Sequence, residues 1–87
     1  MRVLLLEDDA RLRTAYASRL RADGNAVDEA RTLVEARAWL GRTAYDCLVL
    51  DRRVPDGDSV ELVEAIDAMS DRPSILILSG SARTGRG

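Results

Sequence analysis

Apolar residues along the chain gather in short continuous runs, separated by segments with helical spacing. Three runs are strong and one is weaker, and they are Val3–Leu6, Cys47–Leu50, Ile75–Leu78 and Ala26-Val27. Uninterrupted apolar runs of this length are typical of strands in a parallel sheet that is covered on both faces. The pattern therefore predicts four strands, the last of them at an edge of the sheet.

The segments between the runs repeat apolar residues at intervals of three and four, which predicts three amphipathic helices. The three stripes are Leu12, Ala15, Tyr16 and Leu20; then Leu33, Ala36 and Leu40; then Leu62, Val63, Ile66 and Met69. Gly24 and Gly41 stand where the first two helices should end. Thr32–Glu35 has the capping-box pattern at the start of the second helix, and Asp58–Glu61 resembles one at the start of the third.

The elements alternate in the order β-α-β-α-β-α-β, which indicates an α/β fold with a doubly wound parallel sheet. Residues 80–87 are rich in Gly and Arg and show no period. We expect them to form a disordered tail. The folded domain is accordingly predicted to span residues 1–79.

Composition excludes several classes of function. The 87 residues hold 13 basic and 15 acidic side chains, and every basic one is Arg. Without Lys or His the chain cannot form a Ser-His-Asp triad, a Schiff base, a P-loop or a histidine metal site. The balanced charge and scarce aromatic residues argue against nucleic-acid binding.

Cys47 is the single cysteine, and it reads as a small buried hydrophobe inside an apolar run. One cysteine forms no internal disulfide, which fits a reducing compartment. No apolar stretch approaches the length of a membrane span. These features predict a cytoplasmic protein without a membrane partner.

Polar side chains follow three of the predicted strands, where open parallel sheets bind their ligands. Glu7 and Asp8 come after the first strand, Asp51 after the third and Ser79 after the fourth. Two carboxylates about 4 Å apart repel by roughly 4 kcal/mol at an effective dielectric of about 20. A hard cation such as Mg²⁺ relieves this repulsion. Beside such an ion, Asp51 could act as a nucleophile toward phosphorus.

Each of these residues also has a simpler interpretation. Asp8 or Asp9 could only cap the helix that begins near residue 10. Asp51 and Ser79 could be turn residues. Their joint placement at three strand ends, together with the run Asp51–Asp58, favours a shared site.

The chain closely resembles the receiver domain of bacterial two-component response regulators, in the style of winged-helix transcription regulators. The matching stretches are Val3–Asp9, Tyr45–Asp51, Val54–Asp58 and Ile75–Gly80. The resemblance covers Met1 to about Gly80 and implies a flavodoxin-like fold. It also implies a phosphorelay role, in which a sensor histidine kinase supplies the phosphoryl group.

Residue by residue, the resemblance makes Asp51 the phosphoacceptor. Asp8 and Asp51 would bind Mg²⁺ directly, Glu7 through a water molecule, and Arg53 through its backbone carbonyl. Ser79 stands at the position of the switch hydroxyl that contacts the phosphoryl group. The side chains of Arg52 and Arg53 are expected to face solvent.

The chain also departs from the family pattern. The family's fifth strand, last two helices and lysine are absent, and Ser59 stands where the family usually has Gly. We therefore expect a C-terminally truncated receiver, from a shortened or frameshifted gene, with one sheet face covered mainly by the first helix. Marginal stability, or pairing with another receiver, is the predicted consequence.

Two other functions fit the sequence. A degenerate receiver would bind a kinase or another receiver without phosphotransfer, as the missing Lys suggests. A phosphohydrolase with an aspartyl nucleophile usually carries a second acid two residues later, where this chain has Arg53. The enzyme interpretation therefore ranks last, and we predict a non-enzymatic protein.

Overall fold

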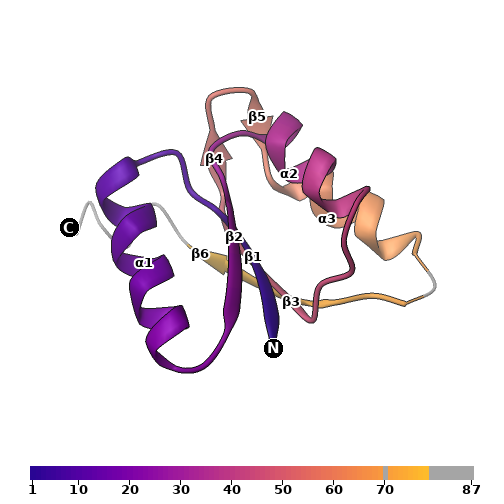
Figure 1. The fold of residues 1–87 in the computed structure, drawn as a ribbon. Helices are drawn as coiled ribbons and strands as arrows, with labels where there is room; N and C mark the ends of the chain where they lie inside the picture. The colour runs from indigo at the N-terminus through magenta and orange to yellow at the C-terminus, as the bar shows by residue number, and fades with distance from the viewer. Residues whose placement is uncertain (70, 79–87) are drawn as a thin grey trace.

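A computed structural model of the chain describes residues 1–69 and 71–78. Its centre is a four-stranded parallel sheet with helices on both faces (Figure 1). The strands lie in the order β2-β1-β3-β6, and their bounds are β1 Arg2–Leu6, β2 Ala26–Ala30, β3 Cys47–Asp51 and β6 Ser74–Leu78. The helices are α1 Ala10–Ala22, α2 Leu33–Leu40 and α3 Val60–Asp67. The α/β fold with four strands and three helices is confirmed.

The sequence pattern gave no sign of a further pair of short strands. Strands β4 Arg53–Val54 and β5 Gly57–Asp58 form an antiparallel ribbon directly after β3. Pro55 and Asp56 form the two-residue turn between them. Strands of two residues are too short to show a period, so the pattern could not predict this ribbon.

Both faces of the central strands β1 and β3 are buried, which explains why these two strands are continuously apolar. Leu4, Leu48 and Leu50 face α2 and α3 in one hydrophobic cluster. Val3 and Leu5 point to the other face, where they join a smaller cluster with α1. Figure 1 shows α1 on one side of the sheet and α2 with α3 on the other. The expectation that the first helix covers one face is therefore confirmed.

Helix α1 begins at a side-chain cap and ends at a glycine. The Asp9 carboxylate accepts hydrogen bonds from the backbone N–H groups of Arg11 at 2.9 Å and Leu12 at 3.1 Å. At the other end Gly24 has a φ of 96°, in the left-handed region that glycine adopts without steric cost. Asp9, and not Asp8, is thus the helix cap, which leaves Asp8 available for other roles.

Two details of the predicted helices were wrong. Helix α3 ends at Asp67, so Met69 lies outside it and is 43% exposed. The predicted cap of α3 is displaced by one residue, because Ser59 occupies the cap position without a side-chain hydrogen bond. Asp58 still accepts from the N–H of Val60 at 2.9 Å, while Glu61 accepts from the N–H of Asp58 at 3.5 Å.

The two edges of the sheet differ in how they are covered. On β2, the outward carbonyl of Val27 accepts from Arg21 at 2.8 Å, and that of Glu29 accepts from the Trp39 indole at 3.1 Å. On β6, the side chains of Leu76 and Ile77 are 55% and 38% exposed. Within the described residues β6 is the edge strand opposite β2 in the sheet order, as predicted, and β2 is the edge that side chains protect.

Candidate functional site: an acidic pocket at the carboxyl edge of the sheet

Three carboxylates meet at the carboxyl ends of β1 and β3. Leu6 pairs with Leu50 across these neighbouring parallel strands, so the residues that follow leave the sheet side by side. One carboxylate oxygen from each of Glu7, Asp8 and Asp51 lies within 4.8 Å of the others. The convergence of Asp8 with Asp51 is confirmed.

The carboxylates differ in their exposure to solvent. Glu7 is fully buried and Asp51 is 1% exposed, whereas Asp8 is exposed to solvent. Buried negative charges at this spacing are costly unless a positive charge offsets them. An all-oxygen donor set that is buried on one side and open on the other suits Mg²⁺, which keeps several water ligands. The residues present therefore fit a hard divalent cation.

The turn that carries Glu7 and Asp8 is held by hydrogen bonds from α1. The Arg13 guanidinium donates to the backbone carbonyl of Glu7 at 2.9 Å and approaches that of Asp8 at 3.4 Å. The N–H of Asp9 donates to the Glu7 carboxylate at 3.1 Å. Arg13 also forms an ion pair with Glu29 on β2 at 3.4 Å. Arg13 thus holds the backbone of the turn that carries Glu7 and Asp8.

The role of Arg13 was not predicted from the sequence. The available signal was its place one helical turn after the cap, where its N–H donates to the Asp9 carbonyl at 2.8 Å. That spacing places the side chain beside the preceding loop. The balanced composition gave no reason to single out one arginine among 13.

The β4–β5 ribbon follows Asp51 directly in the sequence. The N–H of Ser59 donates to the carbonyl of Arg52 at 2.8 Å and closes the base of the loop. The side chains of Arg52 and Arg53 are exposed, as predicted. The Arg53 backbone thus lies two residues beyond Asp51 in a loop closed at its base.

The contact that Asp56, at the tip of this ribbon, makes with helix α2 was also not predicted from the sequence. Its carboxylate accepts from the backbone N–H groups of Leu33 at 2.8 Å and Val34 at 3.1 Å, at the start of α2. The Leu33 hydrogen bond is the main reason that the pKa of the Asp56 carboxyl lies below its usual value. Sequence separation hides such a contact, since Asp56 and Leu33 are 23 positions apart.

The fifth residue assigned to the site, Ser79, lies outside the described residues, as does the tail at residues 80–87. Ser59, noted for standing in place of Gly, is wholly buried. Among the described residues no partner lies within hydrogen-bond reach of its hydroxyl.

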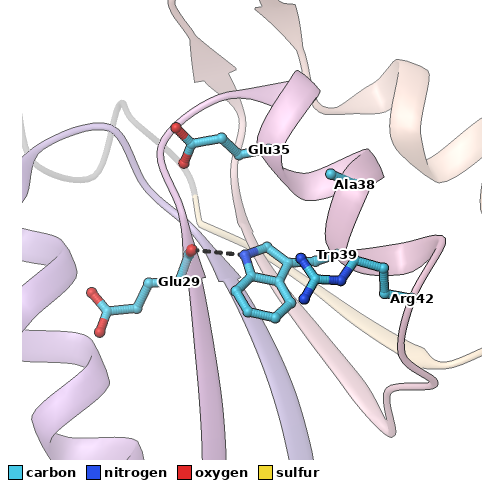
Figure 2. A pocket seen from close by; sticks show the side chains of 5 residues that line it. All are labelled: Glu29, Glu35, Ala38, Trp39 and Arg42. Carbon is cyan, nitrogen blue, oxygen red and sulfur yellow. Dashed lines mark hydrogen bonds between the residues drawn. The ribbon is translucent and has the colours of Figure 1, made fainter.

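A second hollow, on the α2 side of β2, differs in character from the acidic pocket. It has a volume of about 330 Å³ and is lined by Glu29, Glu35, Ala38, Trp39 and Arg42. Figure 2 shows the indole of Trp39 directed at the Glu29 carbonyl. The Arg42 guanidinium lies 5.1 Å from the Trp39 ring centre, while Glu35 pairs with Arg31 at 3.0 Å. The polar side chains around this hollow thus have partners within the protein.

None of the helices in the described part of the chain is long and apolar enough to cross a membrane.

The fold and the pocket together define a class of protein. It is a doubly wound α/β domain of the flavodoxin-like type, with a buried carboxylate cluster where its two central strands end. The chain belongs to the response regulator receiver domain family, whose model matches residues 3–85. Members of this family act in two-component signalling, in which phosphorylation and Mg²⁺ are typical.

Individual relatives agree with this assignment. The KDP operon transcriptional regulatory protein KdpE of Escherichia coli K12 is 30% identical over 84 residues, which are 97% of this chain and 37% of KdpE. The chain therefore spans about a third of the length of that regulator. The virulence transcriptional regulatory protein PhoP of Salmonella typhimurium strain 14028s is 33% identical over 98% of this chain and 37% of its own.

A solved structure supports the fold directly. The non-phosphorylated HemR receiver domain from Leptospira biflexa superposes with a TM-score of 0.83 at 36% identity, over 99% of this chain and 72% of that chain. The earlier prediction of a receiver domain is thus confirmed.

Proposed function

We propose that this chain is a phosphoacceptor receiver in which a sensor histidine kinase phosphorylates Asp51 with the help of Mg²⁺. The observation that carries the proposal is the buried carboxylate of Asp51 within 4.8 Å of oxygens from Glu7 and Asp8. A carboxylate in such a cluster is placed to act as a nucleophile toward phosphorus. The proposed reaction follows from the family to which the chain belongs, and the proposed residues follow from the carboxylate cluster.

Each residue of the pocket has a distinct role in the proposal. Asp8 and Asp51 would bind Mg²⁺ directly, Glu7 through a water molecule, and Arg53 through its backbone carbonyl. The ion would offset the negative charge of the pocket and of the incoming phosphoryl group. Ser79 would donate its hydroxyl to the phosphoryl oxygens after transfer.

The transfer itself is a displacement at phosphorus. A carboxylate oxygen of Asp51 forms the new P–O bond while the P–N bond of a phosphohistidine breaks. The departing imidazole nitrogen keeps the bonding electron pair and takes a proton from water. No oxidant or further reactant is needed, and the product is an aspartyl phosphate.

One feature of the composition favours a second function. The 87 residues contain no lysine, so none of them offers a side-chain ammonium group to a phosphoryl oxygen. A chain that binds a kinase or a second receiver without phosphotransfer would not need that group. Both functions share the protein partners, and they differ only in whether Asp51 is modified.

Amide NMR of the whole chain, with Mg²⁺ and with Mg²⁺ plus beryllofluoride, tests the proposal. We expect the signals of Asp8, Asp51 and Arg53 to move with both additions, because beryllofluoride stands in for an aspartyl phosphoryl group. The isosteric Asp51→Asn variant should lose both responses. Asp67→Asn, which removes the same charge far from the pocket on α3, should keep them.

Two further results would separate the alternatives. Incubation with acetyl phosphate should add one phosphoryl group to the wild-type chain, detected by mass spectrometry, and none to Asp51→Asn. A wild-type chain that binds a kinase but gains no phosphoryl group would favour the interaction module. Spectra in which no signal moves on addition of Mg²⁺ or beryllofluoride would refute the phosphoacceptor proposal.

A further inference from the structure

The start of helix α2 is held by two residues from different parts of the chain. Leu33 and Val34 donate their N–H groups to separate oxygens of Asp56 at 2.8 and 3.1 Å. The next N–H, from Glu35, goes to the hydroxyl of Thr32 at 3.1 Å. Helix starts leave such groups without helical partners, so caps are needed. Two of these three hydrogen bonds thus go to a ribbon more than 20 positions away in the sequence.

The ribbon also packs tightly against the same turn of α2. A Cβ atom at Gly57 would lie 3.0 Å from Cδ1 of Leu33 and 2.9 Å from Oε2 of Glu61. Val54, on the other strand of the ribbon, packs on the hydrophobic cluster that includes Leu33. The ribbon and the first turn of α2 are therefore joined by both hydrogen bonds and close packing.

The ribbon in turn carries the backbone of Arg53, only two residues after Asp51. The hydrogen bond from Ser59 to the Arg52 carbonyl holds the base of the loop at 2.8 Å. Asp56 holds its tip. The Arg53 carbonyl lies between these two anchors, in a strand that pairs with β5, so its position depends on how the whole ribbon is held.

We propose that Asp56 is a positioning residue: by clamping the ribbon to α2, it fixes the Arg53 carbonyl at the acidic pocket. The inference rests on the proposed binding of Mg²⁺ in that pocket. Asp56 itself does not touch the ion. Residues that orient metal ligands in this way change metal affinity by about 10–100-fold when they are replaced.

An Asp56→Asn variant tests the clamp. Asn replaces one of the two carboxylate oxygens with an NH₂ group, so either the Leu33 or the Val34 N–H group loses its present acceptor and faces a donor instead. We expect the dissociation constant for Mg²⁺, measured by amide NMR titration of the whole chain, to rise about tenfold.

A matched control separates positioning from a general weakening of α2. Thr32→Ala removes the hydrogen bond to Glu35 at the same helix start but leaves the ribbon contact intact. We expect Thr32→Ala to bind Mg²⁺ like the wild type. Equal losses in both variants, or no loss in Asp56→Asn, would overturn the positioning role. A wild-type chain that does not bind Mg²⁺ would instead refute the proposed function, and this inference with it.

A second measurement uses the wild-type chain alone, so it tests the proposal even if the Asp56→Asn variant does not fold. Coupling between two sites is reciprocal, so if Asp56 ties the pocket to α2, Mg²⁺ must tighten the clamp. In the wild type, Mg²⁺ should slow hydrogen exchange at the amides of Leu33 and Val34 more than at Glu35. Exchange that slows equally at all three amides, or at none, would contradict the proposal.

Discussion

The Arg13 guanidinium donates to the backbone carbonyl of Glu7 at 2.9 Å and so ties helix α1 to the turn that presents two of the three pocket carboxylates. The same side chain pairs with Glu29 on the neighbouring strand. The positively charged Arg13 side chain thus holds the backbone of the turn, and the carboxylates of Glu7 and Asp8 lie near that of Asp51.

Replacing Arg13 should destabilise the protein. Arg13→Gln shortens the side chain and removes the ionised donor from a site that is only 15% exposed. Hydrogen bonds to charged groups contribute about 1.5–3 kcal/mol, so we expect the free energy of unfolding to fall by roughly 2 kcal/mol. Urea denaturation measures the change. Arg11→Gln, on the exposed side of the same helix, should change it by less than about 0.5 kcal/mol; equal losses would point to overall charge as the cause.

Gly57 should not tolerate a side chain. Its φ of 147° lies where L-residues are strained, and a Cβ there would crowd Leu33 and Glu61. We expect Gly57→Ala to lower the free energy of unfolding by about 1–3 kcal/mol.

Gly41→Ala is the matched control for that change. Gly41 has a φ of −73°, and its new Cβ would meet only backbone oxygens at ordinary distances. There we expect no loss, or a gain of about 0.4–1 kcal/mol from the less flexible unfolded chain. Thermal unfolding of both variants makes the comparison, and similar losses at the two positions would contradict the argument.

Removing the hydroxyl of Ser59 should stabilise the protein. The hydroxyl is fully buried and lacks a hydrogen-bond partner among the described residues, so its desolvation is uncompensated there. We expect Ser59→Ala to raise the free energy of unfolding by about 1 kcal/mol, measured by chemical denaturation. Ser59→Gly should gain less, because glycine adds backbone freedom to the unfolded chain. A loss in Ser59→Ala would mean that the hydroxyl has a partner in solution.

Tyr45 should make the protein unstable at high pH. Burial, and secondly a hydrogen bond to Asp28 at 2.7 Å, raise the pKa of Tyr45 from 10 to about 12. Between these values the unfolded chain ionises this tyrosine and the folded chain does not. Stability from this group is therefore complete below about pH 10 and falls as the pH rises toward 12.

Unfolding curves collected at successive alkaline pH values check this expectation. Tyr45→Phe removes the ionisable group and should flatten the dependence in the same window. The Cys47 thiol, whose pKa burial also raises, remains in both proteins and so cancels in the comparison. Identical pH dependence in the two proteins would show that another group controls alkaline unfolding.

The sequence alone predicted the main architecture because the signals for it are local and periodic. Continuous apolar runs marked β1 and β3, since strands covered on both faces have no polar side. The same kind of run marked β6, although Leu76 and Ile77 on it are exposed. Parallel strands end at a common edge, so the acidic residues after β1 and β3 could be expected to meet. Asp8 and Asp51 were therefore predicted together although they are 43 positions apart in the sequence.

The three-dimensional structure decided whatever depends on contacts between distant segments. The contacts of Asp56 with α2 and of Arg13 with the Glu7 turn leave no periodic trace, because each is a single side chain that reaches a backbone group from another element. The choice of Asp9 over Asp8 as the cap of α1 likewise depended on where the loop places each carboxylate. Sequence patterns record which face of an element is buried; which polar side chain meets which backbone group is settled only when the packed elements fix their relative positions.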